Sequence, residues 1–425
     1  MRFLFVHQNF PGQYLHVLKR LVSLGHEVVF ITQPSPNHLA GVRVAYYERP
    51  ALNESLQGTI RDADAALRRA EAVAHVAANL KRLGFVPDII IGHHGWGELL
   101  SLVDVFPGAP ILGYFEFYYR TTGQDVNYDL EFPIDPVQFG NVRAMNIVNM
   151  LALGLEQHGQ TPTRWQLSRY PDWAQTRIKL LPEGADLTLC RPDPKAKTRT
   201  ISIGDFRIGP KDRLVTYVAR NLEPYRGFHT MMRALPELLR RRDVKVVMVG
   251  GDDVSYGGKL VGSTWREHFQ RELSGKYDTS RVLMPGQVPY ETYLSLLQRS
   301  DVHVYLTYPF VLSWSLREAM AMGCAIVGAD VEAVREVITE RKTGLLTPGL
   351  DPSGVARRVL ELLDNEVLAA KLRQGARRHA EKHLDLEHHL AAFMDRIAEI
   401  TGQHPVASSI LPAGRREQRR TAKSG

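Results

Sequence analysis

Two successive series of short apolar runs alternating with helical patterns constrain this chain more than any other feature. The first series opens with the apolar run Phe3–Val6, followed by a helical pattern at Tyr14–Ser23 and a second apolar run at Glu27–Thr32. The second series opens at Leu214–Ala219. Strands that alternate with helices form parallel sheets covered by helices on both faces. The sequence therefore predicts an α/β protein with two Rossmann-like, doubly wound domains that face a cleft, where ligands of such sheets bind.

The remaining elements continue both series. In the first, we expect a long helix from about Thr59 to Leu83 and strands at Ile89–Ile91 and Pro110–Tyr114. In the second, apolar runs predict further strands at Lys245–Val249, Val282–Pro285, Val302–Leu306 and Ala325–Ala329. Helical patterns fall at Phe228–Arg241, Trp265–Leu273, Tyr290–Gln298, Leu316–Met322, Glu332–Thr339, Ser353–Asp364, Glu366–Leu384 and Glu387–Ile400.

The length of 425 residues exceeds what one hydrophobic core supports, so the chain is expected to divide into domains. The stretch Arg191–Lys211 is rich in Pro, Lys and Gly and has little periodicity, which is typical of a linker. We therefore predict an N-terminal domain (1–186), a linker (187–211), a C-terminal domain (212–385), a helix returning to the N-terminal domain (386–402) and a mobile basic tail (403–425).

The chain is basic, with a formal net charge of +7 and a pI of about 9.3. An anionic partner is favoured by this charge, although the run Arg415–Arg420 places part of it in the tail. The cysteines Cys190 and Cys324 form no metal-binding or disulfide pattern. Because no apolar run could span a bilayer and the first residues enter a strand, we expect a cytoplasmic protein. Peripheral contact with an anionic inner membrane face stays open, and no aromatic–basic stripe points to nucleic acid.

Two arginines flank the turn that follows the strand Leu214–Ala219. Arg220 and Arg226 lie six residues apart, and Gly227 then opens a helix. Guanidinium groups pair with phosphate oxygens in a bidentate manner, and a helix N-terminus favours anions. The turn is a candidate diphosphate site, or else carries two solvated loop arginines.

A second candidate lies at the start of the helix Leu316–Met322. Ser313 and Ser315 precede this helix, where backbone N–H groups can meet phosphate. Glu318 lies about one turn further and could accept both hydroxyls of a ribose. Alternatively, Glu318 is a helix-start glutamate favoured by the helix dipole.

The end of the strand Lys245–Val249 offers a weaker signal. Gly250 and Gly251 would allow the backbone to approach a ligand closely, but glycines are also common in plain turns. No G-x-G-x-x-G fingerprint follows the first strand, which argues against an NAD enzyme.

Two loops of the first series are candidates for contact with an acceptor or a phosphate. The loop after Phe3–Val6 contains Gly12 and Gln13, which would face the cleft unless this is a plain turn. The loop after Ile89–Ile91 contains His93 and His94. Adjacent histidines do not point the same way, so joint metal ligation is not expected.

Glu116 follows the strand Pro110–Tyr114 within a run of aromatic residues. Its neighbours Phe115, Phe117, Tyr118 and Tyr119 could desolvate the carboxyl and raise its pKa, as in a catalytic acid or base. The alternative is an ion pair with Arg120.

Taken together, these segments resemble the retaining glycosyltransferases of family four, which have the GT-B fold. The resemblance covers most of the chain, to about Ile400. Arg220 and Arg226 match the family's Arg and Lys pair on the donor diphosphate, with Arg in place of Lys. Glu318, in Glu-Ala-Met-Ala-x-Gly, matches the second Glu of the E-x7-E motif, which binds the donor ribose. Further similar segments are Glu183–Asp186, Pro285–Pro289 and Ser300–Val302, which resemble the interdomain segment and the surroundings of the base pocket.

Two positions depart from the family pattern. The first Glu of E-x7-E, which approaches the donor sugar, is replaced by Phe310. A His found in many members corresponds to Glu116. The opening Asn9–Gln13 and the segment Phe115–Glu116 look like one subgroup of the family, so both departures are read as subgroup traits.

The resemblance implies transfer of a sugar from a nucleoside diphosphate sugar to an acceptor hydroxyl, with retained α configuration and without a metal or other cofactor. Synthesis of a polysaccharide, glycolipid or related glycoconjugate is the expected setting. Two rival functions stay open: a non-catalytic sugar-nucleotide-binding protein, favoured by Phe310, and a nucleotide-sugar epimerase, which shares the two-domain shape.

Overall fold

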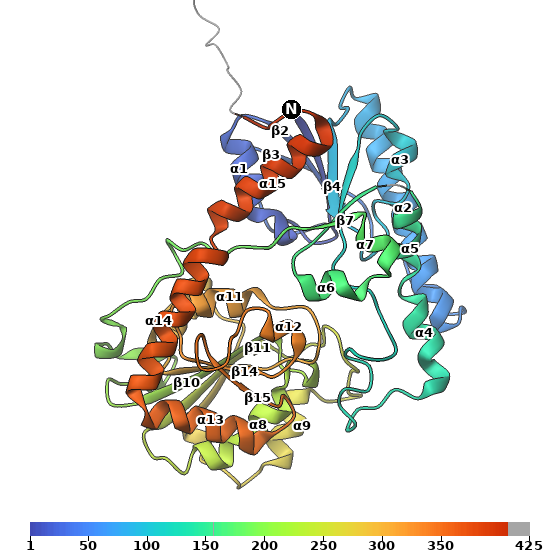
Figure 1. Ribbon diagram of the computed structural model, residues 1–425. Helices are drawn as coiled ribbons and strands as arrows, with labels where there is room; N and C mark the ends of the chain where they lie inside the picture. The colour runs from blue at the N-terminus through green and yellow to red at the C-terminus, as the bar shows by residue number, and fades with distance from the viewer. Residues whose placement is uncertain (156, 407–425) are drawn as a thin grey trace, which may run out of the picture. The chain divides into compact units, whose positions relative to one another are not determined.

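The computed structural model describes residues 1–155 and 157–406, so most of the predicted basic tail lies outside the described residues (Figure 1). Its contacts divide the chain into two compact units. Unit 1 contains Met1–Phe115, Ile147–Gln160 and the described residues from Leu390 onward, and unit 2 contains Glu116–Asn146 and Thr161–His389. The domain boundaries expected from the sequence do not coincide with this division and stay a prediction.

The first sheet has the strand order β3-β2-β1-β4-β5-β6-β7. Its strands are β1 (Arg2–Val6), β2 (Glu27–Thr32), β3 (Val42–Tyr46), β4 (Ile89–His93), β5 (Ile111–Tyr114), β6 (His158–Thr161) and β7 (Ile178–Leu180). Neighbours from β3 to β6 pair in parallel. The apolar residues Phe3–Val6 are fully buried, as expected for a strand that helices cover on both faces.

Short helices connect these strands, apart from the long α2. They are α1 (Leu15–Ser23), α2 (Gly58–Arg82), α3 (Leu102–Val105), α4 (Phe139–Ala144), α5 (Ile147–Gly154), α6 (Arg164–Arg169) and α7 (Asp172–Gln175). Within unit 1, α2 and α5 are in contact and run side by side in Figure 1. The strand order reverses between β1 and β4. Strands β2 and β3 follow on the β1 side, and strands β5 to β7 follow on the β4 side.

The second sheet has the order β12-β11-β10-β13-β14-β15, and all its pairs are parallel. Its strands are β10 (Arg213–Asn221), β11 (Val244–Gly251), β12 (Val282–Gly286), β13 (Val302–Tyr305), β14 (Ile326–Ala329) and β15 (Leu345–Thr347). Here the order reverses between β10 and β13. The two parallel sheets confirm the predicted α/β class with two Rossmann-like units.

Helices of the second series begin within two residues of the predicted starts, although the helix that starts at Glu332 ends at Arg335 instead of Thr339. They are α8 (Phe228–Leu238), α9 (Trp265–Glu272), α10 (Tyr290–Arg299), α11 (Trp314–Ala321), α12 (Glu332–Arg335), α13 (Pro352–Asp364), α14 (Glu366–His383) and α15 (Leu386–Thr401). Within unit 2, α8 and α13 pack side by side (Figure 1). Buried residues such as Val246, Val304 and Val327 form the centre of its core.

The stretch expected to be an irregular linker contains regular structure. Strands β8 (Ile201–Ile203) and β9 (Phe206–Ile208) form an antiparallel hairpin, and Ile208 is fully buried. Their apolar side chains pack against Leu214 and Val247 of unit 2. The short strands carry too few alternations for a period to be visible, which is why the pattern suggested a linker.

Candidate functional site

Most of the predicted site residues lie on loops at the point where strand order reverses. Loops leaving the two central strands of a doubly wound sheet diverge, and ligands bind outside the strands' carboxyl ends at this switch point. In unit 2, the segment Arg220–Gly227 ends and follows β10, and the loop leading to Ser313 follows β13. In unit 1, the segment after β1 carries Gly12 and Gln13, and His93 ends β4 with His94 directly after it.

Arg226 is buried at the switch point of unit 2, with only 6 % of its surface exposed. Its Nη1 donates hydrogen bonds to Thr307 Oγ1 at 3.1 Å and to the Val311 carbonyl oxygen at 2.9 Å. The guanidinium carbon lies 5.0 Å from the ring centre of Tyr256 and 5.7 Å from that of Phe310. Both of these hydrogen bonds use one nitrogen of a group with five N–H donors. The anchored guanidinium is therefore suited to present other donors to a phosphate.

The turn that carries Arg226 depends on Gly227. This residue has φ +69°, and an added Cβ would lie 2.4 Å from the Leu306 Cβ. Both the left-handed conformation and the close packing favour glycine. Gly227 thus joins the buried Arg226 to the start of α8 without pushing away the loop after β13.

The Glu223 carboxylate holds the loop that contains Tyr256, whose ring lies over Arg226. Glu223 is fully buried, and its oxygens accept the backbone N–H groups of Ser255, Tyr256 and Gly257 at 3.1–3.2 Å. These three backbone donors tie the loop Ser255–Gly257 to the Glu223 carboxyl group. Sequence reasoning missed Glu223, because a Glu-Pro pair in a turn gives no sign of burial.

Arg220 and the two glycines have different surroundings. Arg220 is exposed, unlike Arg226. An added Cβ at Gly250 would lie 2.9 Å from the Ala219 carbonyl oxygen, and one at Gly251 would lie 2.6 Å from Asn221 Oδ1. Packing of β11 against the end of β10 therefore requires these glycines, whether or not a ligand approaches them.

Ser313 caps α11, and this confirms the expected helix start. Its Oγ accepts the N–H of Ser315 at 3.3 Å and lies 2.9 Å from Ser315 Oγ. The N–H of Ser313 itself donates to Tyr305 Oη at 2.8 Å. Two backbone donors of this loop thus already have partners within the protein.

Glu318 lies in the second turn of α11, and two phenol groups contact its carboxylate. Tyr290 Oη donates to Oε1 at 2.7 Å, and Tyr293 Oη donates to Oε2 at 2.6 Å. Burial raises the pKa of Glu318, whereas these hydrogen bonds from Tyr293 and Tyr290 oppose the rise. The sequence pointed to Glu318 but not to its tyrosine partners.

Phe310 lies in an aromatic cluster where the family pattern has a glutamate. Its ring centre is 4.5 Å from Phe117, 4.8 Å from Tyr256 and 5.2 Å from Tyr225, and 3 % of its surface is exposed. The substitution therefore exchanges a carboxylate for packed aromatic surface next to Arg226.

Glu116 is half-buried and belongs to unit 2. The following residue, Phe117, is the one that packs on Phe310. The backbone carbonyl of Glu116 accepts a hydrogen bond from Gln166 Nε2 at 2.6 Å. This position fixes the backbone of Glu116 beside the aromatic cluster, while its catalytic role stays a prediction.

At the switch point of unit 1, aromatic and imidazole rings pack together. The His93 ring stacks on Trp96 with 4.4 Å between ring centres, and the His7 ring lies 5.6 Å from His93 and 5.4 Å from Trp96. His93 Nδ1 accepts the N–H of Gly95 at 2.7 Å, so its neutral form carries the proton on Nε2. The sequence did not single out His7.

The loop after β1 packs directly on His7. Gly12 has φ +56°, and an added Cβ would lie 3.1 Å from the His7 ring. The Nε2 atom of Gln13 is buried and has no hydrogen-bond partner among the described residues. An amide donor in that state is available to a ligand or water.

His94 differs from the expectation that both histidines face an acceptor. It is fully buried, and its ring lies 4.7 Å from that of Phe115 and against Gly113. Burial lowers the pKa of His94 to about 3, so the ring is neutral at ordinary pH. His94 therefore lies in the buried interior of unit 1.

Asp129, Glu131 and His229 bring their ligand atoms within 4.8 Å of one another, as a metal site would require. Arg233 donates to both oxygens of Glu131 at 2.6 and 2.8 Å, and His229 lies 3.0 Å from Asp129 Oδ2. Burial raises the pKa of Asp129, but hydrogen bonds from His229 and Tyr308 outweigh burial and lower this pKa to about 2. A cation would have to displace Arg233, so these groups form an ion-pair network.

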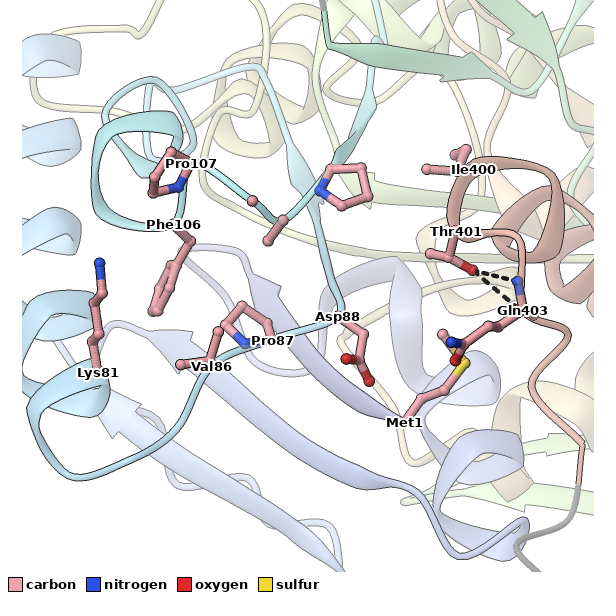
Figure 2. Close-up of a pocket in the computed structure, with 13 residues that line it drawn as sticks. Met1, Lys81, Val86, Pro87, Asp88, Phe106, Pro107, Ile400, Thr401 and Gln403 are labelled. Atoms are coloured by element: carbon pink, nitrogen blue, oxygen red, sulfur yellow. Dashed lines mark hydrogen bonds between the residues drawn. The ribbon is translucent and has the colours of Figure 1, made fainter.

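A separate hollow of about 550 Å³ lies at the amino ends of β1, β4 and β5 (Figure 2). Its walls include Met1, Asp88, Phe106 and Gln403. Because ligands of doubly wound sheets bind at the carboxyl ends, this hollow is not the candidate site.

Comparison with known proteins matches both halves of the chain to glycosyltransferases. The family model "Glycosyl transferase family 4 group" matches residues 24–190, and "Glycosyl transferases group 1" matches residues 199–379. The D-inositol 3-phosphate glycosyltransferase of Corynebacterium efficiens is 29% identical over 48% of this chain and 47% of its own. The phosphatidyl-myo-inositol mannosyltransferase of Mycolicibacterium smegmatis is 31% identical over 37% of this chain and 38% of its own. The chain thus spans about half the length of these curated relatives or less.

Solved structures agree over nearly the whole chain. Sucrose-phosphate synthase from Thermosynechococcus elongatus has a TM-score of 0.70 and 18% identity, covering 95% of this chain and 99% of its own. Anabaena HepE in complex with UDP-glucose has a TM-score of 0.63 and 15% identity, covering 94% and 100%. At these identities the likeness concerns the fold. The subgroup marked by Asn9–Gln13 stays a prediction, but the chain belongs to the family-four glycosyltransferases and has the GT-B fold.

Proposed function

We propose that the protein transfers a sugar from a nucleoside diphosphate sugar to an acceptor hydroxyl, with retention of the α configuration. The buried and hydrogen-bonded position of Arg226 at the switch point of unit 2 supports this most strongly. Arg226 and the exposed Arg220 would neutralise the leaving diphosphate, the main electrostatic task of such a reaction. Glu318 would hold the ribose, and Gly250, Gly251, Ser313 and Ser315 would line the donor site.

A transfer assay tests the proposal. UDP-glucose is the first donor to test, because HepE was solved with it, followed by other UDP- and GDP-sugars. D-inositol 3-phosphate and phosphatidyl-myo-inositol are the first acceptors, since they appear in the names of relatives. A thermal-shift screen selects the donors, because a ligand bound only by the folded state raises Tm. We expect an α-linked product.

The rival functions give different outcomes in the same assay. A non-catalytic binder would raise Tm with a nucleotide sugar but form no product and release no nucleotide. An epimerase would convert the donor to a second sugar without any acceptor. Either result would replace the transferase proposal.

We propose that the reaction needs no divalent metal. In the described ranges, Asp129, Glu131 and His229 form the group that could hold an ion, and its carboxylates are occupied by Arg233, Tyr308 and His229. Activity should survive EDTA. Loss of activity that magnesium or manganese restores would contradict the proposal.

We also propose peripheral contact with a membrane, supported by the exposed side of α5. Ile147, Met150 and Leu151 are 36–44 % exposed and have the spacing of one helix face. The opposite face, with Val148, Ala152 and Leu153, is buried. In the described part of the chain, no helix has the length and apolar character needed to cross a bilayer.

Liposome flotation separates the two sources of membrane contact. Leu151→Ser should weaken binding if α5 inserts, whereas removal of residues 407–425 should weaken binding to anionic vesicles if the basic tail acts. Leu83→Ser, at another exposed leucine of unit 1, is the matched control. Equal binding by all three variants and the wild type would dispose of both sources.

A further inference from the structure

The carboxylate of Glu318 is bracketed by two tyrosines from a neighbouring helix. Tyr290 Oη lies 2.7 Å from Oε1 and Tyr293 Oη lies 2.6 Å from Oε2, so each oxygen receives its own donor. Three residues apart on α10, the tyrosines share a helix face, and their rings stack with 5.7 Å between centres. The carboxylate plane is therefore fixed from both sides.

The bracket leaves accepting capacity on both oxygens. An ionised carboxylate has about four lone-pair sites, so one phenol on each oxygen leaves about one further site per oxygen. Two neighbouring acceptors of this kind match two hydroxyl donors on adjacent carbons, which is the arrangement of a ribose diol.

The two tyrosines differ in exposure. Tyr293 is buried at 8 % exposure, whereas Tyr290 is 48 % exposed. The Glu318 carboxylate is itself only partly buried. The group formed by Tyr293, Glu318 and Tyr290 thus extends from the core of unit 2 to its surface, where a nucleotide can reach the carboxylate.

We propose that Tyr290 and Tyr293 are positioning residues that orient Glu318 toward both hydroxyls of the donor ribose, and so set a preference for ribonucleotides over 2′-deoxyribonucleotides. This inference rests on the proposed function, because it takes a nucleoside diphosphate as the ligand. Tyr293 fixes the inner oxygen, and Tyr290 fixes the outer one.

Calorimetry with matched nucleotides tests the proposal. The probes are UDP and 2′-deoxy-UDP, and GDP and 2′-deoxy-GDP, titrated into the full chain. A hydrogen bond to a charged group predicts that the wild type prefers the ribonucleotide by roughly tenfold or more. Tyr293→Phe and Tyr290→Phe should each reduce this ratio several-fold, mainly by weakening ribonucleotide binding.

Two controls separate positioning from a general structural effect. Tyr277→Phe removes a phenol from a partly buried ring of the same core and should leave the ratio unchanged. Glu318→Gln should itself abolish most of the preference, and adding Tyr293→Phe to it should change the ratio no further.

The outcomes are distinguishable. An unchanged ratio in both tyrosine variants, or equal weakening of both nucleotides, overturns the inference alone. Ribonucleotide preference that depends on the tyrosines, without any sugar transfer, supports the inference and overturns the proposed function. If the wild type binds none of the four nucleotides, both are overturned.

Discussion

The switch points of the two units share a strand arrangement but differ in the chemistry of their loops. In unit 2 the loops present charge: Arg226 and Glu223 are buried with partners, and Glu318 is held by phenols. In unit 1 the corresponding region presents His93 and Trp96, a stacked pair of rings. Binding of a diphosphate requires cationic side chains, whereas a hydroxyl group that receives a sugar requires a hydrogen-bonding group that need not carry a charge. The difference indicates that strand order fixes where a ligand binds, and loop chemistry fixes which ligand binds.

The largest expected effect concerns the charged site. Arg226→Ala should weaken UDP or GDP binding by roughly thirtyfold, about 2 kcal/mol, because it removes a buried guanidinium that donates hydrogen bonds to phosphate. It should also lower Tm, since Thr307 and the Val311 carbonyl lose their partner. Arg220→Ala should weaken binding to a comparable degree with Tm unchanged, because Arg220 is exposed.

Calorimetry and thermal melting measure these changes, with the exposed Arg240→Ala as a control in the same unit. Unchanged nucleotide affinity in both Arg220→Ala and Arg226→Ala would refute the diphosphate assignment and remove the contrast between the two units.

Glu116 tests whether a carboxylate beside the aromatic cluster takes part in the reaction. Glu116→Gln keeps the shape and removes the charge, so kcat should fall at least tenfold, about 1.4 kcal/mol of barrier. Donor affinity should not change. Normal kcat together with a lowered Tm would show a structural role instead.

The buried imidazoles predict how acid affects each unit. Burial lowers the pKa of His94 in unit 1 to about 3 and that of His303 in unit 2 to about 4, from 6.5. As pH falls below 6.5, these imidazoles bind protons in the unfolded chain but not in the folded chain, so the free energy of unfolding decreases. The loss should be about 1 kcal/mol per imidazole at pH 6.

Urea unfolding from pH 7.5 to 5 measures this loss, and His94→Asn and His303→Asn should each make the pH profile flatter. If neither variant changes the slope, other groups control the acid response. Separate flattening by each variant would show that both units contribute.

His93 is expected to have the smallest effect. His93→Ala removes a ring that stacks on Trp96, so acceptor KM should rise about threefold, a cost within the range of one aromatic contact. Donor affinity should stay the same, because His93 lies in unit 1. The exposed His38→Ala is the control, and a change in donor Kd would contradict the division of roles.

Long, strongly patterned elements were predictable from the sequence. The predicted strand Glu27–Thr32 coincides with β2, and the expected helix Thr59–Leu83 lies within one residue of α2 at each end. Strand β6, in contrast, reads His-Gly-Gln-Thr and has no apolar residue. It is a strand because it pairs with β5, which local periodicity does not encode.

The position of the candidate site residues in the fold was predictable to a similar degree, whereas their roles stay a prediction. The spacing of Arg220, Arg226 and Glu318 located the loops after β10 and β13. Their surroundings were missed, because the burial of Glu223 and the bracket formed by Tyr290 depend on residues distant in sequence. Side-chain type is written in the sequence, but desolvation and partnership arise from tertiary packing.

The division of the chain between the units has a consequence for biosynthesis. The chain passes from one unit to the other after Phe115, Asn146, Gln160 and His389. Unit 1 therefore lacks Phe393 and Ile397 of α15, both buried, until the ribosome has translated almost all of the described sequence. A gene cut after codon 186 would encode neither unit in full, so exchange of a whole unit between relatives requires several crossover points rather than one.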